Sequence, residues 1–247
     1  MENALLVGLS QQTALRRRMD ILANNLANMS TAGFKSETPI FEDFVMPAAS
    51  VTGFTGEAAD IHYVHDRALF RDFAEGPLNR TDNSLDMAIN GKGWFVLDGP
   101  EGELYTRNGH FHLDGEGRVV TSDGLPVTTE EGPVIIKPGE TGLSITADGL
   151  ISTDEGEKGK LRIVEIEDEA LLMKQASGVY SAENTAAIPA TGYHITQGAL
   201  EGSNVNAIGE MTEMIAVARA YTTASELLNN TDTLRRRAIE TLGQTPS

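Results

Sequence analysis

The apolar residues near both ends of the chain recur at alternating spacings of three and four, the pattern of an amphipathic helix in a helical pair. The first stripe contains Leu5, Gly8, Gln12, Leu15, Met19, Leu22, Leu26 and Met29. The second contains Met214, Val217, Tyr221, Ala224, Leu228, Thr231 and Ala238. Two positions of the first stripe, Gly8 and Gln12, are weak because neither residue has a large apolar side chain. The pattern predicts helices at residues 3–29 and from about residue 207 to residue 242.

Polar residues mark the limits of both predicted helices. Gly33 can adopt a left-handed backbone and end the first helix, and Asn204 or Asn206 can cap the start of the second. The first helix also contains Asn24, Asn25 and Asn28, which are poor helix formers in a helix interior. We therefore expect this helix to need a partner for its apolar stripe, either the other terminal helix or copies of the chain, and to be disordered before assembly.

Between the helices, the pattern changes to short apolar runs separated by turns. Asn-Gly and Asp-Gly pairs follow one another closely from residue 81 to residue 198, which predicts hairpins in an all-β module. Strand-like runs occur at residues 85–89, 93–97, 103–106, 118–121, 134–136, 143–145 and 161–166, and residues 168–174 fit one or two helical turns. Residues 36–80 have few periodic cues, and we expect one or two strands there.

The pattern as a whole predicts an α+β fold with a coiled-coil-like helical region and a central, hairpin-rich β domain. Residues 1–35 and 200–247 would form a terminal helical region for polymerisation. Residues 36–80 would form an extended connecting arm, and residues 81–199 the central β domain. A chain that begins and ends in matching helices suggests an axial or polymer-forming protein rather than an enzyme.

The net charge of −17 is unevenly distributed along the chain. Residues 1–30 carry +1 and residues 198–247 carry −2, so the middle carries −16. Such an acidic middle disfavours binding to nucleic acid, because it would repel the phosphates. Solubility is a simpler explanation for the negative charge than a specific surface for cations or a partner. Two basic triplets, residues 16–18 and 235–237, lie on the predicted helices. They indicate either solvated helix faces or pairing with acids of neighbouring subunits.

Composition also limits the compartment and the chemistry. The absence of cysteine excludes disulfides, cysteine zinc sites and thiol nucleophiles. No apolar run approaches the roughly 20 residues needed to span a bilayer, so we expect no membrane insertion. The first residues lack the basic segment of a cleaved signal peptide, and we expect export, if any, by another route.

We find no motif that predicts catalysis. The phosphate-loop, GxSxG and HExxH patterns are absent, and the glycines around Lys92 fit a turn. The pairs His62/His65 and His110/His112 are more typical of ordinary histidines than of a metal site, because no cysteine supports them. Trp94 could stack on a sugar, but an aromatic residue in a strand is usually part of the core. We expect no catalytic residue, cofactor or metal.

Three classes of function fit these observations to different degrees. The first is a non-enzymatic structural subunit that polymerises. The second is a secreted, β-rich enzyme or sugar-binding protein that acts on the cell wall. The third, a cytoplasmic export chaperone, is disfavoured because it would not need a hairpin-rich middle.

Several segments resemble the flagellar basal-body rod and hook proteins. They are residues 14–35 (ALRRRMDILANNLANMSTAGFK), 83–95 (NSLDMAINGKGWF), 105–109 (YTRNG) and 197–206 (QGALEGSNVN), followed by residues 210–215 and 219–221. The paired terminal motifs are highly specific, whereas residues 36–80 and 125–195 carry little of the similarity. Within the family, the chain length and the run at residues 75–83 are most similar to proximal rod members, with distal rod members as the near alternative.

The resemblance implies a structural subunit of the rod, the drive shaft that transmits torque across the periplasm. It implies terminal helices that polymerise with copies of the chain and with other rod proteins, after export through the flagellar type III apparatus. It implies no chemistry. The predicted assembly interface comprises Leu5, Leu15, Met19, Leu22, Leu26, Met29, Met214, Val217, Tyr221, Ala224 and Leu228.

Overall fold

The computed structural model describes residues 2–46, 61–137, 139–176 and 178–243 of the 247-residue chain. The chain divides into two compact units. The helical unit comprises Met1–Ala27, Glu37–Phe70 and Asn206–Ser247, and the β-rich unit comprises Asn28–Ser36 and Arg71–Val205. The predicted α+β fold, with a helix at each end and strands between them, is confirmed. The assignment of separate functions to three regions stays a prediction.

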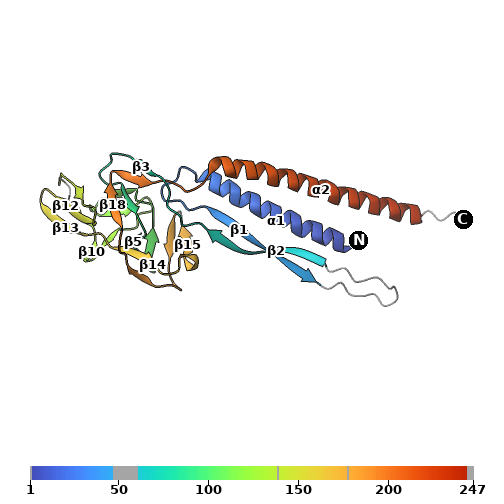
Figure 1. Cartoon of the computed structure of the whole chain (residues 1–247), viewed down its shortest axis with the longest axis horizontal. Coiled ribbons are helices and arrows are strands. Elements are labelled where there is room, and N and C mark those ends of the chain that lie inside the picture. The colour runs from blue at the N-terminus through green and yellow to red at the C-terminus, as the bar shows by residue number, and fades with distance from the viewer. Residues whose placement is uncertain (1, 47–60, 138, 177, 244–247) are drawn as a thin grey trace. The chain divides into compact units, whose positions relative to one another are not determined.

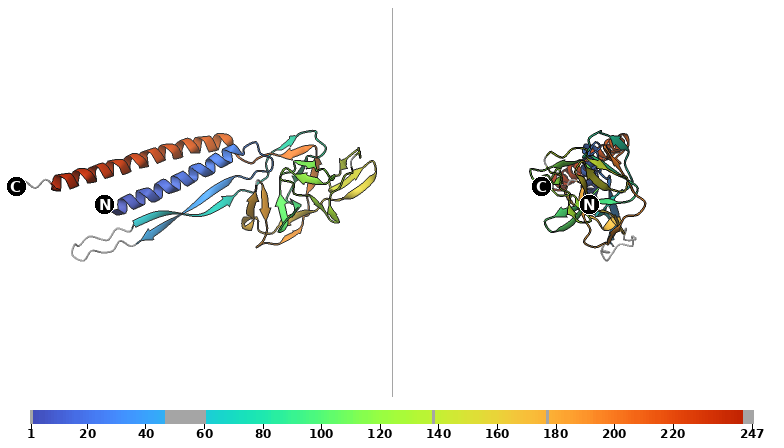
Figure 2. Two further views of the ribbon diagram at one scale, coloured as in Figure 1. Left: turned by 180° about the vertical axis from the view of Figure 1, so that it is seen from behind. Right: turned by 90° about the vertical axis from the view of Figure 1, so that its left-hand side faces the viewer.

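The helical unit contains the two terminal helices and a two-stranded ribbon. Its elements are α1 (Glu2–Ala27), α2 (Ala207–Gly243), β1 (Glu37–Met46) and β2 (Ile61–Arg71, of which the last residue belongs to the β-rich unit). Within this unit, α1 lies beside both α2 and β1 (Figures 1 and 2). One or two strands were expected in residues 36–80, and the structure has three there, the two strands of the ribbon and β3 (Leu78–Arg80). Neither helix of the described chain is long and apolar enough to cross a membrane.

The helix ends follow the sequence signals to within two residues. α1 ends at Ala27 rather than at the predicted Met29, and Gly33 has the left-handed φ of +67° expected of it. α2 begins directly after Asn206, whose side-chain Oδ1 accepts a hydrogen bond of 3.2 Å from the backbone N–H of Gly209. The predicted cap is therefore confirmed, because it satisfies one of the free amides of the first turn.

The β-rich unit is built from short strands. They are β3 (Leu78–Arg80), β4 (Met87–Asn90), β5 (Trp94–Gly99), β6 (Gly102–Thr106), β7 (Phe111–Leu113), β8 (Val119–Thr121), β9 (Thr128–Thr129), β10 (Gly132–Pro133), β11 (Ser144–Ile145), β12 (Leu150–Thr153), β13 (Gly156–Lys160), β14 (Ile163–Ile166), β15 (Met173–Ala176), β16 (Val179–Ser181), β17 (Ala187–Pro189), β18 (His194–Gln197) and β19 (Ala199–Glu201). The segment expected to form one or two helical turns contains a single 3₁₀ turn, η1 (Glu169–Leu171), which Asp168 caps.

The largest sheet has six antiparallel strands in the order β15-β16-β6-β5-β14-β17. Because side chains alternate along a strand, β5 contributes to two cores. Phe95 and Leu97 belong to one buried cluster, and Trp94 and Val96 belong to the other. This two-sided burial explains why residues 94–97 form a continuous apolar run. A second sheet has the order β11-β12-β13, and the remaining strands pair as β18-β4, β19-β3, β7-β8 and β10-β9.

The turn signals were more reliable than the strand limits. Gly124 and Gly149, the second residues of two Asp-Gly pairs, have φ angles of +80° and +88°, which favour glycine. The predicted strand at residues 134–136 is wrong. The backbone N–H of Val134 bonds to Val127, whereas that of Ile136 bonds to Gly117, so the segment divides its hydrogen bonds between two neighbours and forms no regular ladder.

A buried carboxylate attaches β13 to the loop before β11. The Glu140 side chain is almost fully buried and accepts a hydrogen bond of 2.6 Å from Lys158 Nζ and one of 2.8 Å from Thr153 Oγ1. The bond from Lys158 is the largest influence, and together these contacts lower the pKa of Glu140 from 4.5 to about 2. The ionised carboxylate therefore stabilises the folded chain.

We expect this carboxylate to contribute to acid sensitivity. Its folded pKa lies below its unfolded pKa, so its contribution is complete above about pH 4.5 and is lost as the pH falls towards 2. The Glu140→Gln variant should be less stable than the natural chain at pH 6 and should lose less stability between pH 4.5 and pH 2. Urea unfolding across this range would measure both effects. The exposed neighbour Glu155 offers a control, Glu155→Gln, and an equal change in both variants would contradict the assignment.

Candidate functional site

The predicted stripes of the two terminal helices meet each other within one chain. Gly8 of α1 lies opposite Leu228 of α2, Arg18 bonds to Glu213, and Asn25 bonds to Glu210, so the helices run antiparallel. The stripe residues that are buried are Leu22, Val217 and Ala224, and those that are partly buried are Gly8, Gln12, Leu15, Met19, Leu26, Met214, Tyr221, Leu228 and Thr231, whereas Ala238 is exposed. We call this contact the seam. The partner that α1 requires is therefore α2 of the same chain.

Two predicted members of the interface are not shown in the seam. The side chain of Leu5 lies outside the described side chains. Met29 lies two residues beyond the end of α1, belongs to the β-rich unit and is 49% exposed. Gly8, a weak position in the sequence pattern, has a clear role, because a Cβ there would lie 2.5 Å from Cδ2 of Leu228. The leucine occupies the space that a side chain at position 8 would need.

Asn25 fixes the helices to the ribbon through its side-chain amide. Its Nδ2 donates to the backbone oxygen of Glu37 at 2.8 Å and to Glu210 Oε2 at 3.2 Å, and its Oδ1 accepts from the backbone N–H of Glu37 at 3.0 Å. The sequence pattern showed only a poor helix former at this position. Burial raises the pKa of Glu210, the bond from Asn25 opposes this effect, and the nearby Glu213 adds to it.

The basic triplets contribute pairs within the helical unit. Arg18 Nε donates to Glu213 Oε1 at 2.7 Å, which joins α1 to α2, and Arg236 Nε donates to Asp232 at 2.9 Å within α2. All four side chains are substantially exposed, so each pair contributes little to stability. Pairing between subunits stays a prediction.

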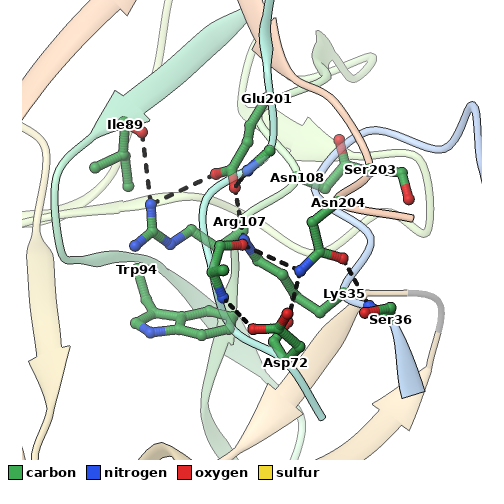
Figure 3. Close-up of polar contacts among 12 residues, drawn as sticks. Lys35, Ser36, Asp72, Ile89, Trp94, Arg107, Asn108, Glu201, Ser203 and Asn204 are labelled. Atoms are coloured by element: carbon green, nitrogen blue, oxygen red, sulfur yellow. Dashed lines mark hydrogen bonds and ion pairs between the residues drawn. The ribbon is translucent and has the colours of Figure 1, made fainter. Parts of the chain in front are cut away.

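A cluster of three buried charges lies in the β-rich unit, and we call it the ion cluster (Figure 3). Glu201 Oε1 accepts a hydrogen bond from Lys35 Nζ at 2.6 Å, and Glu201 Oε2 lies 3.4 Å from Arg107 Nη1. The three side chains are between 1% and 4% exposed. Two buried cations thus share one buried carboxylate, an arrangement that is stable only when further polar partners complete it.

Backbone groups from several segments complete the ion cluster. Lys35 Nζ donates to the carbonyl of Ala74 at 2.7 Å, and Glu201 Oε1 also accepts from the backbone N–H of Gly76 at 3.1 Å. The Arg107 guanidinium donates to the carbonyl of Gly91 at 3.0 Å and lies 5.6 Å from the centre of the Trp94 ring. Among the described residues its Nε has no hydrogen-bond partner. The cluster joins segments that are far apart in the sequence.

The chain leaves the β-rich unit at two points that are bonded together. Asn204 Oδ1 accepts a hydrogen bond from the backbone N–H of Ser36 at 2.8 Å (Figure 3). The backbone N–H of Asn204 donates to the carbonyl of Phe34 at 3.3 Å. Gly33 donates to the carbonyl of Glu201 at 2.8 Å. A Cβ on Gly33 would lie 2.5 Å from the backbone N of Asn108, so only glycine fits. Residues 33–36 are therefore fixed against residues 201–204.

The other residues considered as possible sugar or metal ligands are Trp94 and the histidines. Trp94 is buried, donates from Nε1 to Glu169 at 3.0 Å and packs edge-on against Tyr180, so it belongs to the core as predicted. His110 Nδ1 lies 2.8 Å from Asp86 Oδ1. The side chains of His62 and His65 lie outside the described side chains. The described residues contain no group of three potential metal ligands.

Both ends of the chain and part of its middle match families of known proteins. Residues 5–35 match the family described as flagella basal body rod protein, and residues 196–241 match the C-terminal region of the flagellar basal body rod FlgEFG proteins. Residues 88–153 match the D1 domain of the flagellar hook protein FlgE/F/G. The flagellar basal-body rod protein FlgF of Caulobacter vibrioides is 38% identical over 247 residues, covering 99% of each chain. This chain belongs to the flagellar basal-body rod protein family.

Further relatives include both rod proteins that the sequence resembles. FlgF of Rhizobium meliloti is 34% identical and covers 98% of this chain and 99% of its own, and FlgG of Bacillus subtilis is 30% identical and covers 97% and 98%. The chain is accordingly a structural subunit of the bacterial flagellar basal-body rod. The relatives' names describe rod proteins, and they give no support to the cell-wall enzyme or sugar-binding alternative.

The family matches coincide with the sites described above. The match at residues 5–35 covers most of α1 and includes Lys35, and the match at residues 196–241 includes Glu201 and nearly all of α2. The match at residues 88–153 includes Arg107, so both halves of the seam and all three charges of the ion cluster lie in segments that match the family.

Proposed function

We propose that this rod subunit polymerises through its terminal helices, with copies of itself and with other rod proteins, and so transmits torque across the periplasm. The observation that carries the proposal is the seam, in which the first and last helices of the chain form one antiparallel pair. A pair built from both chain ends gives an elongated helical element on whose outer faces neighbours can pack. We propose no catalytic role and no cofactor.

We further propose a proximal place in the rod, as the resemblance to FlgF implies, with a distal place like that of FlgG as the alternative. The identities of 38% and 34% to the two FlgF relatives, against 30% to a FlgG relative of similar coverage, support this order. The family resemblance also supports delivery through the flagellar type III export apparatus, without a cleaved signal peptide.

Deletion of the gene in its own bacterium tests the proposed function. Basal bodies isolated from the deleted strain should lack an assembled rod, and the cells should not swim in soft agar. The full chain supplied in trans should restore both, whereas a chain that ends at Val205, before α2, should restore neither. Normal rods and normal swimming in the deleted strain would contradict a structural role.

A further inference from the structure

The seam is filled within a single chain, so a contact between subunits must use additional surface. Large apolar side chains of α2 are exposed near its start and near its end, and Leu227 and Leu234 are exposed between these two regions. One group is at the start of the helix, Ile208, Met211 and Ile215, and we call it the start patch. The other, at the end of the helix, contains Ile239 and Leu242, and we call it the end patch. These five side chains are between 45% and 79% exposed. Grouped exposed apolar side chains mark interaction sites more often than scattered ones.

The start patch lies on the face of α2 that points away from the seam. Its members are spaced by three and four residues, so they share one side of the helix. Ile208 precedes the seam residue Val217 by nine positions, a rotation of about 180° at 3.6 residues per turn. The start patch is therefore a separate surface from the α1–α2 contact.

The end patch continues the seam beyond the end of α1. Gly8 lies opposite Leu228 and is six residues from the start of α1, whereas α2 continues for fifteen residues beyond Leu228. Leu242 lies two heptads after Leu228 and so on the same side of the helix. The last turns of α2 extend past the start of α1 (Figure 1), and Leu242 continues the apolar stripe there.

We propose that the end patch of one subunit packs against the start patch of a second copy of this chain. The proposal rests on the proposed polymerisation and specifies the surfaces that it uses. The two patches differ and lie at opposite ends of one helix, roughly 45 Å apart at 1.5 Å per residue. Such a heterologous contact leaves one patch free at each end and generates an open filament.

Pairing of two end patches with each other is the less favourable arrangement. The segment from residue 234 to residue 243 carries three arginines and one acid, Glu240. Two such segments side by side would repel each other, and their symmetric contact would close into a dimer. The continuity of the end patch with the seam instead suits a partner surface that is apolar and helical, as the start patch is.

Cysteine crosslinking tests the proposal, because the natural chain contains no cysteine. The double variant Met211→Cys/Leu242→Cys, made in place of the natural chain and oxidised in isolated basal bodies, should form a ladder of covalent dimers, trimers and larger species. Each single variant should remain monomeric. The pair Met211→Cys/Thr223→Cys is the matched control, because Thr223 is an exposed residue of α2 outside both patches, and it should give no ladder.

The outcomes separate this proposal from the proposed function. Rods that contain the double variant but give no ladder would overturn the patch contact alone, as would dimers formed by the single Leu242→Cys variant. Absence of the natural chain from isolated rods would overturn polymerisation itself. A second pair, Ile215→Cys/Ile239→Cys, reports the same contact if the first pair impairs assembly. Loss of rods with both pairs, but not with the control pair, would support the contact.

Discussion

The Glu201→Gln variant is expected to lose about 3–5 kcal/mol of the free energy of unfolding of the β-rich unit. The substitution keeps the size of the side chain and removes its charge. Lys35 and Arg107 would then be two buried cations without a counter-charge, since Glu201 is the carboxylate that both contact. The loss is large because the penalty for burying each cation remains after its attraction to the carboxylate has gone.

The Lys35→Met variant is the matched comparison. It leaves one cation, Arg107, paired with one carboxylate, so its cost should be clearly smaller than that of Glu201→Gln. The double variant should be more stable than the sum of the two single effects predicts, because it removes one of the two cations left unpaired by Glu201→Gln. This non-additivity is the signature of direct coupling.

Fluorescence of Trp94, the only tryptophan of the chain, makes the measurement specific to the β-rich unit. Urea unfolding of the full chain would give the midpoint for each variant. Equal destabilisation by Lys35→Met and Glu201→Gln, or strict additivity in the double variant, would show that the two cations do not depend on the shared carboxylate.

The Leu22→Asp variant is expected to separate α1 from α2 and to abolish rod assembly while leaving the β-rich unit folded. Leu22 is 5% exposed in the seam. Removing a buried leucine costs about 2–5 kcal/mol, and an unpaired carboxylate in its place adds to that cost. A two-helix pair of this size is only marginally stable, because each helix depends on the other to bury its apolar stripe.

Far-UV circular dichroism and Trp94 fluorescence separate the two parts of this prediction. Helical signal should fall in the Leu22→Asp variant, whereas the unfolding midpoint reported by Trp94 should not change. The control is Leu9→Asp on the same helix, where the side chain is 57% exposed and the helical signal should be preserved. Swimming cells with normal rods in the Leu22→Asp strain would contradict the role of the seam.

The terminal helices could be predicted closely because their spacing and caps are local signals. The stripe, Gly33 and Asn206 define both elements without knowledge of the rest of the chain. The same local signals could not identify what fills the stripe. The sequence left open whether each helix pairs with the other or with copies of the chain, and Gly8 and Leu228 show a fitted contact within one chain.

The ion cluster could not be predicted, because its members are distant in the sequence and look ordinary in it. Lys35 and Glu201 are 166 residues apart, and a single lysine and a single glutamate are normally surface residues. The role of Asn25 could not be predicted for a related reason. Its partner is the backbone of Glu37, and a hydrogen bond to a backbone group leaves no signal in the sequence. The prediction of a strand at residues 134–136 was wrong because the backbone hydrogen bonds of this segment are divided between two neighbouring segments, and the apolar content of the sequence does not reveal this.

The hydrogen bonds of Asn204 with Phe34 and Ser36 have a mechanical consequence. The two exits of the chain from the β-rich unit are tied to each other by Asn204, and the buried pair of Lys35 and Glu201 lies immediately inside them. Tension applied between the two exits therefore acts on the hydrogen bonds of Asn204 before it acts on the sheets. A subunit pulled at these two exits would strain the hydrogen bonds of Asn204 before those between its strands.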